Sequence, residues 1–470
     1  MSTQQVILTG ILVYLACLAA LGFWASTRTR SAEDFLVAGR SMPVWMCTAT
    51  IIATWLGGAS MLGASGQAYQ GGLFAVLADP FGAALGVLLI GLFVIGSVRR
   101  MRLLTVVEFV EYRYGTSLAL LWSVYAVAAN VGWVGATMVA FGFVFSTLVG
   151  LPLEVGIVVG GIIVVLYAMA GGMWAVAYTD FLQLSIIVVG ALFLLVLVVE
   201  DLGGVLRAWE AVPAEKLRLI PAERSVDAWL NYVHVLFILS VTNLSAQALL
   251  QRGFSARSER AAQSSFILAA FGYLAIALIP VALGILGSLL IPDLQDRQAI
   301  VPTLAVEYLS PVLLAIFVGA LLSAIMSTAD SALLATASIV SVNILPRIWP
   351  GTAQRKLMMA RVTILVTGAL AIIVALQAQT IFELILAINA PALAATVAPF
   401  ILALAWKGAN RTGGWAAVVT GLLIWGLVAL LAPSLPGDLI GMAASFVALI
   451  AGSLASQRRD PPPDRTLGVC

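Results

Sequence analysis

Charged side chains are scarce in this chain, because Asp, Glu, Lys and Arg together make up 10% of its 470 residues. A soluble domain carries roughly 25% charged residues, so this scarcity excludes a soluble globular protein. No alternating ten-residue strand pattern recurs, which argues against a membrane-spanning barrel. Hydrophobic residues, in contrast, reach 62%. The composition therefore predicts an all-α polytopic protein embedded in a lipid bilayer.

Histidine and cysteine are also rare, with one histidine, His234, and three cysteines, Cys17, Cys47 and Cys470. Their spacing fits neither a metal site nor a disulfide framework. A membrane enzyme needs a clustered nucleophile and base or a metal set, so we expect no enzymatic activity and no organic cofactor. The net charge of +2, without a basic-aromatic patch, argues against a nucleic-acid partner.

The chain is rich in apolar runs, each long enough to cross a bilayer, which takes about 20 residues. We expect about thirteen transmembrane helices, at 5–25, 44–70, 73–98, 117–149, 153–171, 179–199, 229–250, 264–291, 306–340, 358–378, 380–406, 413–432 and 437–455. They form a single transmembrane domain, 1–455, with a core at about 44–406. The segment 456–470 has a Pro-rich end and is expected to be a disordered cytoplasmic tail.

Lys and Arg residues are unevenly distributed between the two sides of the membrane. With a cytoplasmic C-terminus, nineteen of the 24 fall on the cytoplasmic side. The other five are Arg207, Lys216, Arg218, Arg224 and Arg297. Because cytoplasmic loops carry the excess of these residues, we expect a plasma (inner) membrane protein with its N-terminus outside.

The longest polar interval, about 200–227, divides the chain near its middle. Five expected helices precede it, after an additional first helix, and five of the helices that follow it complete a matching set. This spacing fits a 5+5 inverted repeat, a common plan of secondary transporters, although the two halves share no convincing sequence identity.

A series of small and hydroxyl side chains lies within the apolar run 306–340. Ala324, Ser327, Thr328 and Ser331 are spaced i, i+3, i+4 and i+7, which places them on one helix face. Lipid offers these hydroxyls no hydrogen-bond partner, so their partners must lie inside the protein. Small residues allow a neighbouring backbone to approach, and oxygens that point one way suit a hard cation. The pattern predicts an ion site at membrane depth and therefore a transporter.

The run 44–70 contains four glycines at membrane depth, Gly57, Gly58, Gly63 and Gly66. Each glycine costs about 1 kcal/mol in a helix interior, so the cluster predicts a break. A break frees backbone carbonyls, which must then line a cavity or an ion site. The alternative is that the glycines only permit close helix packing.

Four ordered motifs now point to a family: Ala-Thr-Trp-Leu-Gly-Gly at 53–58, Gly-Gly-Met-Trp-Ala-Val-Ala-Tyr-Thr-Asp at 171–180, Gln-Ala-Leu-Leu-Gln-Arg at 247–252 and Met-Ser-Thr-Ala-Asp-Ser at 326–331. The chain resembles the sodium:solute symporter family over roughly residues 5 to 430, and within it the high-affinity choline transporter branch. The resemblance implies a LeuT-type core with one additional helix before it and two after it. It also implies sodium-coupled symport of a small organic solute by alternating access.

The resemblance further implies a sodium site between the broken helix and the run 306–340. Its backbone carbonyls would come from Ala53, Leu56 and Ala324, and its hydroxyls from Ser327 and Thr328. Five oxygens without a carboxylate suit a monovalent ion that is released again. The alternative is that the two hydroxyls only bond to carbonyls one turn earlier in their own helix.

Aromatic residues at Trp55 and Trp133 correspond to part of the cage that holds a quaternary ammonium in the choline-like branch. Ala246 and Ile385 stand where that branch places further aromatics, so a choline-like amine, an amino acid and a small carboxylate all remain candidate solutes. Asn243 and Gln247, one helical turn apart, are expected substrate contacts.

Asp180 has two interpretations from the sequence. It could cap the N-terminus of the helix that follows, as Asp often does. The family resemblance suggests instead a second ion site or the sodium exit route, and proton coupling through Asp180 is a variant of that idea. A non-transporting channel or sensor relative is the other alternative. We expect no obligate protein partner.

Overall fold

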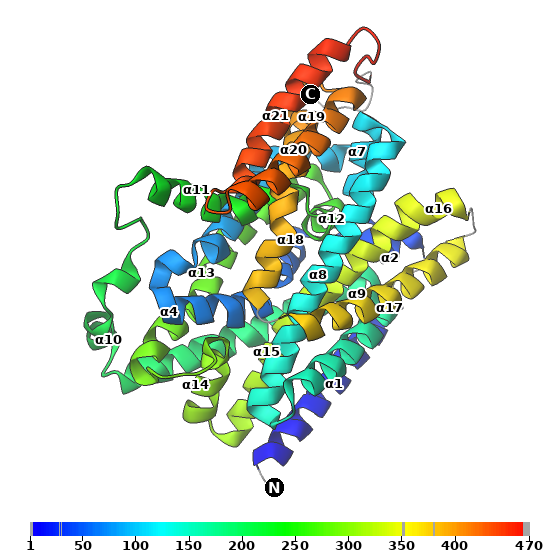
Figure 1. Cartoon of the computed structure of the whole chain (residues 1–470). Coiled ribbons are helices and arrows are strands. Elements are labelled where there is room, and N and C mark those ends of the chain that lie inside the picture. The colour runs from blue at the N-terminus through cyan, green and yellow to red at the C-terminus, as the bar shows by residue number, and fades with distance from the viewer. Residues whose placement is uncertain (1–2, 28, 30, 350–352, 379–380, 464–470) are drawn as a thin grey trace.

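The computed structural model describes residues 3–27, 29, 31–349, 353–378 and 381–463, and these residues form helices and no strand. The helices pack against one another, at varied crossing angles, into one bundle (Figure 1). The only extended pairing in the described residues is a single bridge between Met42 and Ala256. The predicted all-α class is confirmed, and residues 464–470 of the predicted tail lie outside the described residues.

Ten of the described helical segments are long and apolar enough to cross a membrane, or up to twelve spans if two bent helix pairs are included. A shorter apolar helix, Leu153–Met169, coincides with one further expected run. All thirteen expected runs therefore coincide with helices. Whether every one of them spans the bilayer stays a prediction.

The principal helices are α1 (Thr3–Ser26), α3 (Val44–Trp55), α4 (Ser65–Ala75), α7 (Val106–Tyr114), α8 (Thr116–Val149), α9 (Leu153–Asp201), α11 (Val226–Ser240), α12 (Gln247–Ser255), α13 (Glu259–Leu290), α15 (Pro311–Ile339), α17 (Ala353–Gln377), α18 (Ile381–Ala395), α19 (Val397–Ala405), α20 (Arg411–Leu431) and α21 (Gly437–Ser456). Short helices connect them: α2 (Ala32–Val37), α5 (Ala83–Leu89), α6 (Ile95–Arg100), α10 (Val205–Ala211), α14 (Ile300–Tyr308) and α16 (Leu345–Ile348).

The helix that contains the glycine cluster is broken, as predicted. α3 ends at Trp55, a π-helical turn follows at Ala59–Ala64, and the two helical segments meet at an angle of 56°. Gly57 also permits a close approach, because a Cβ there would lie 2.1 Å from the Thr328 hydroxyl oxygen. Gly57 therefore serves both the break and tight packing against α15.

The expected helix 229–250 differs from the structure, because it is interrupted between α11 and α12. A short 3-10 turn at Thr242–Ser245 and an extended Ala246 separate the two helices. The hydroxyl of Thr242 donates to the Ile238 carbonyl, and the amide of Asn243 donates to the Leu239 carbonyl at 2.6 Å. These side chains compete with backbone donors for the last carbonyls of α11, which favours ending the helix there.

The helix broken after α3 is the first of the first expected set of five, and the helix broken after α11 is the first of the second set. Inverted-repeat transporters use such paired broken helices for their binding sites. α18 and α19 form a second bent pair, with an angle of 42°, in the run where Pro391 and Pro399 predict a bend. α15 lies in the centre of the bundle against α1, α8, α9 and α17, and its residues from Phe317 to Ile339 are buried.

The last two helices, α20 and α21, pack against each other and against α18 at one end of the bundle (Figure 1). His234 of α11 lies 2.7 Å from the Asp438 carboxylate of α21, measured from Nε2 to Oδ2. The only histidine in the chain therefore joins the core to an added helix.

Candidate functional site

The predicted ion ligands meet where the break after α3 faces the middle of α15. The Ser327 hydroxyl donates to the Ala53 carbonyl across the two helices at 2.9 Å. It also lies 3.1 Å from the Ala324 carbonyl, and the Thr328 hydroxyl lies 3.3 Å from the same oxygen. All four residues are at most 2% exposed. Uncharged carbonyl and hydroxyl oxygens from two helices thus lie within a few ångströms of each other, which fits a small monovalent cation.

Leu56 lies in the break itself, with backbone angles φ −75° and ψ 72°, outside the helical region. It directly precedes Gly57, which faces Thr328. The structure therefore brings the residues of all five predicted ligands to the contact between the break and α15. Ser327 and Thr328 also bond to the Ala324 carbonyl within α15, as the alternative predicts. That alternative does not predict the bond from Ser327 to Ala53 of another helix.

Asp180 does not cap a helix, because α9 continues on both sides of it and is interrupted earlier, at Gly172. Its carboxylate is fully buried and accepts a hydrogen bond from the Thr50 hydroxyl of α3. Asp330 of α15 and Arg252 of α12 are its charged neighbours. Arg252 donates to Ser331, one turn beyond Ser327 on α15. Asp180 therefore belongs to a buried polar cluster next to the predicted ion ligands.

One oxygen each of Asp180 and Asp330 is buried without a hydrogen-bond partner, as is Nε of Arg252. A buried polar atom without a partner is costly in an apolar interior. The cluster thus has unsatisfied bonding capacity, which is compatible with a bound ion or water.

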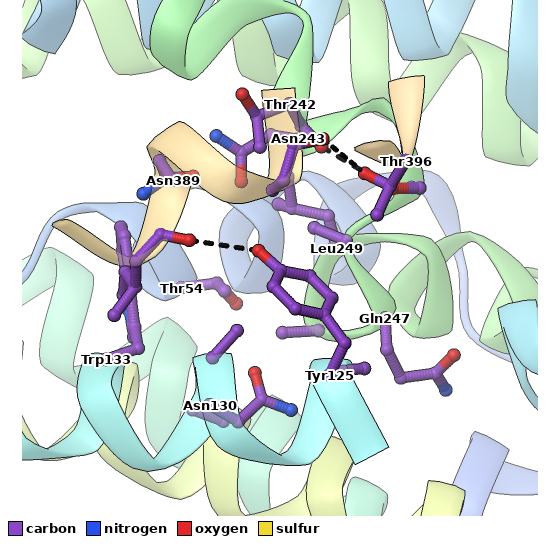
Figure 2. A pocket seen from close by; sticks show the side chains of 18 of the residues that line it. Thr54, Tyr125, Asn130, Trp133, Thr242, Asn243, Gln247, Leu249, Asn389 and Thr396 are labelled. Carbon is purple, nitrogen blue, oxygen red and sulfur yellow. Dashed lines mark hydrogen bonds between the residues drawn. The ribbon is translucent and has the colours of Figure 1, made fainter. Parts of the chain in front are cut away.

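A cavity of about 110 Å³ lies next to the break in α3. Figure 2 shows the side chains of 18 of the residues that line it. The lining residues come from α3, α8, the α11–α12 connection, α12, α15 and α18: Thr54, Trp55, Trp122, Tyr125, Ala126, Ala129, Asn130, Trp133, Thr242, Asn243, Ser245, Ala246, Gln247, Ala248, Leu249, Thr328, Ala332, Ile388, Asn389, Ala392 and Thr396. All four predicted substrate contacts are among them.

The two predicted cage tryptophans contact each other. The rings of Trp55 and Trp133 meet edge to face, with 5.6 Å between their centroids. Trp55 also contacts Tyr273 of α13, with 6.2 Å between centroids. Trp55 is 4% exposed, whereas Trp133 is only half-buried. Of the two side chains, Trp133 is therefore the more exposed.

The amide of Gln247 is bonded away from the cavity. Its oxygen accepts from the Val106 backbone N–H at 2.7 Å, and its nitrogen donates to the Leu104 carbonyl at 3.1 Å. Figure 2 shows this amide turned away from Tyr125. Gln247 therefore presents its aliphatic part to the cavity and ties α12 to the start of α7.

Trp122, Tyr125 and Asn130 line the cavity from α8 and were not predicted from the sequence. Together with Trp133 they are spaced i, i+3, i+8 and i+11, which is one helical face. This periodicity was visible in the sequence and could have identified them. Asn389 of α18 faces the same space (Figure 2).

Asp79 was also missed. It lies in a non-helical position after α4, is 4% exposed, and accepts hydrogen bonds from Ser60, at 2.9 Å, and from the Tyr273 hydroxyl. An acidic residue inside an apolar run is the signal that could have marked it. Its hydrogen-bond partner Tyr273 contacts the ring of Trp55.

Among the described residues that line the cavity, none carries a charge. Its walls consist of aromatic rings, small apolar groups, hydroxyls and amides. Rings attract organic cations and amides bind neutral polar groups, whereas a solute with a net negative charge finds no basic side chain in this lining.

A model of the Sodium:solute symporter family matches residues 35–421 of the chain. The human high affinity choline transporter 1 is 28% identical over 443 residues, which is 89% of this chain and 76% of that protein. The sodium/pantothenate symporter of Escherichia coli (strain K12) is 27% identical and is aligned over 94% of this chain and 96% of its own length. The sodium/glucose cotransporter of Vibrio parahaemolyticus is 25% identical over 96% and 90%, respectively.

The structure is similar to that of a Na⁺-coupled sialic acid symporter in a substrate-bound, outward-open state. The TM-score is 0.84 with 18% identity, and 98% of each chain is covered. A transporter of the nucleobase-cation-symport-1 family gives a TM-score of 0.64 with 15% identity, over 91% of this chain and 95% of that one. These similarities confirm the predicted LeuT-type fold.

Proposed function

The chain belongs to the sodium:solute symporter family and is a multi-pass, sodium-coupled secondary transporter of a small organic solute rather than an enzyme, and from this premise we propose which residues bind the ion and the solute. Sodium is bound by the carbonyls of Ala53, Leu56 and Ala324 and the hydroxyls of Ser327 and Thr328. The solute is bound in the cavity beside Trp55 and Trp133, with Asn243 and Gln247 in its wall. Both are released when the core changes its orientation.

The observation that carries this proposal is the Ser327–Ala53 hydrogen bond of 2.9 Å across the break. It supports a site that exists only while α15 and the end of α3 stay together. A cation bound between them would stabilise that arrangement, and α3 also supplies Thr54 and Trp55 to the cavity wall. Ion and solute would therefore favour each other's binding by the same free energy.

A choline-like amine is the solute class that the cavity favours. Its lining contains aromatic rings and, among the described residues, no charge. A small carboxylate would be desolvated there without a cationic partner, which is unfavourable. The similarity to choline transporters agrees with this choice, and amino acids and carboxylates are tested as alternatives.

The solute class is tested by thermal-shift measurements on the purified protein with choline, amino acids and small carboxylates, each in sodium and in potassium. A ligand that binds only the folded protein raises its melting temperature. We expect choline to stabilise the protein in sodium more than in potassium. Sodium-dependent stabilisation by carboxylates alone would contradict the choline-like class.

The ion ligands are tested by uptake into proteoliposomes. Ser327→Ala and Thr328→Ala are each expected to raise the sodium concentration for half-maximal uptake by about tenfold, because each removes one oxygen from a charged ligand. Thr336→Ala is the matched control, since Thr336 is a buried hydroxyl of the same helix that bonds to Ala332. An unchanged sodium requirement in both site variants would remove them from the ion site.

Asp180 is proposed to contribute to a second ion site or to the sodium exit route. Its unpartnered carboxylate oxygen and its position beside Arg252 support this role. Proton coupling through Asp180 is the variant that remains. We also propose that the protein resides in the plasma (inner) membrane with the N-terminus outside and the C-terminus in the cytoplasm, as the distribution of Lys and Arg indicates.

A further inference from the structure

One face of α8 lines the cavity over three helical turns. Trp122, Tyr125, Asn130 and Trp133 all contribute to the lining, and Ala126 and Ala129 lie between them. The two tryptophans are eleven positions apart, which corresponds to about 16 Å of helix. This length exceeds the size of one quaternary ammonium group. The two ends of the face can therefore contact such a group at different depths of the cavity.

At the Trp133 end, part of the aromatic surface is already in use. Trp55 contacts both Trp133 and Tyr273, and it is 4% exposed. A cation that binds to a ring needs access to its face. Of the four rings in the described lining, three belong to α8: those of Trp122, which is 5% exposed, Tyr125 and Trp133.

Tyr125 is held in place by α18. Its hydroxyl donates to the Ile388 carbonyl at 2.9 Å, and Figure 2 shows its ring in the space between Trp133 and Thr396. The two helices are close here, because a Cβ on Gly132 would lie 2.6 Å from the Ile388 side chain. This bond fixes the ring without using its faces, so the ring stays available to a ligand.

A cation in this cavity loses water, and the described lining residues offer no carboxylate in exchange. Aromatic faces are the remaining attractive groups. Ala246, which lines the cavity, is one of the two positions where the resemblance led us to expect an aromatic that is missing. Trp122 and Tyr125 supply ring surface to the same cavity from another helix.

We propose that Trp122 and Tyr125 form a binding station for a quaternary ammonium group, in the part of the cavity nearer the start of α8. The inference rests on the proposed function, because it assumes that the solute enters this cavity. It adds two specificity-determining residues and a ligand chemistry, an onium group bound through aromatic faces rather than through a carboxylate.

The test compares charged and neutral ligands of one shape. Choline and its uncharged carbon isostere 3,3-dimethylbutan-1-ol are titrated against sodium-dependent uptake, with radiolabelled choline as the transported probe in proteoliposomes. Trp122→Leu and Tyr125→Leu are each expected to weaken choline about tenfold and to leave inhibition by the isostere nearly unchanged. Tyr125→Phe keeps the ring but loses the bond to Ile388, so its loss for choline should be smaller.

Two controls keep folding separate from binding. Trp209→Leu removes an indole from α10 that is 65% exposed and lies outside the cavity, and it should behave as wild type. Thermal stabilisation by sodium alone should persist in the α8 variants, because the ion ligands lie on α3 and α15. Should Trp122→Leu lose that stabilisation, Trp122→Phe, which keeps an aromatic ring, replaces it in the comparison with Tyr125→Leu.

The outcomes separate the inference from the function on which it rests. Equal losses for choline and for its isostere would assign a packing role to the two residues and overturn the station. Unchanged choline affinity in both Leu variants would also overturn it while sodium-coupled uptake of choline stands. If the wild-type protein transports no choline but another solute with sodium, the station and the choline-like class fail together, and symport stands.

Discussion

Thr328 takes part in both candidate sites. Its hydroxyl oxygen lies 3.3 Å from the Ala324 carbonyl among the ion ligands, and the residue also lines the cavity. Gly57 lies directly opposite. A change in this small volume therefore reaches ion and solute together.

Gly57→Ala tests how tightly this contact is packed. The added Cβ would lie 2.1 Å from the Thr328 hydroxyl oxygen, so α3 and α15 must separate. Overpacking of this kind costs about 1–3 kcal/mol of stability, so we expect a lower melting temperature. We also expect the sodium concentration for half-maximal uptake to rise at least about tenfold. Gly426→Ala is the matched control, because no atom lies within 4 Å of its added Cβ. Wild-type sodium dependence in Gly57→Ala would show that the contact is not part of the ion site.

Asp180→Asn separates sodium coupling from proton coupling at a single residue. The variant keeps the shape of the side chain and can still accept the bond from Thr50, but it removes the charge next to Arg252. If the carboxylate serves a second ion, uptake should require more sodium and rise less steeply with sodium concentration. Uptake driven by a proton gradient without sodium in the wild type, and lost in the variant, would favour the proton instead. Asp201→Asn, at the end of α9, is a suitable control.

The residue scale also shows what a sequence can predict. Ala324, Ser327 and Thr328 were identifiable because their spacing follows the helical period, and the face Trp122–Trp133 carries the same kind of signal. The orientation of the Gln247 amide was not predictable, because its partners, Leu104 and Val106, are more than 140 residues away in the chain.

At the scale of elements, the interrupted helices differ in the sequence signal that marks each interruption. Glycines mark the break after α3, and prolines mark the bend between α18 and α19. The interruption between α11 and α12 contains neither residue. It depends on side-chain bonds of Thr242 and Asn243 to the preceding turn, which occur in unbroken helices as well. Glycine and proline patterns therefore predicted the break after α3 and the bend between α18 and α19, but not the interruption between α11 and α12.

The connection between α9 and α11 docks onto α4, the second half of the first broken helix. Lys216 donates from Nζ to the Tyr69 carbonyl of α4 at 2.8 Å and to the Ser288 hydroxyl of α13 at 2.5 Å. Gly72, at φ +66°, lets the backbone of Lys216 approach, since a Cβ there would lie 2.3 Å from the Lys216 carbonyl oxygen. One lysine thus links this connection to α4 and α13.

Lys216→Ala should loosen α4. We expect faster hydrogen exchange in residues 65–75 and no change in α20, with Arg218→Ala, an exposed neighbour, as control. Burial lowers the pKa of the Lys216 ammonium. A lowered folded pKa makes docking more favourable as pH rises from that pKa toward the ordinary value of about 10.4. The stability difference between wild type and Lys216→Ala should grow over that interval. Equal exchange in both proteins would show that Lys216 does not secure α4.

At the scale of the whole molecule, the cavity reaches from the Trp55–Trp133 contact toward the start of α8. The predicted orientation makes that end cytoplasmic, because it places the start of α8 and the C-terminus on the same side. A solute bound in this conformation would therefore approach the cytoplasm.

Sided labelling checks this orientation. In a variant with Cys17, Cys47 and Cys470 replaced by alanine, Ala129→Cys should react with a membrane-impermeant thiol reagent applied from the cytoplasmic side. Choline with sodium should slow the reaction, because Ala129 lines the cavity. The same alanine background without the new cysteine gives the blank. Labelling only from the outside would reverse the orientation or the side on which the cavity opens.

The ion site takes three of its five proposed ligands from the main chain, at Ala53, Leu56 and Ala324, whereas the cavity is bounded by side chains of α8 and α18. A point mutation cannot delete a carbonyl oxygen of the backbone, but it readily replaces a ring or an amide. Evolution can therefore change the transported solute of this scaffold while the coupling ion stays the same. The same asymmetry favours laboratory selection for new solutes from libraries confined to residues 122–133.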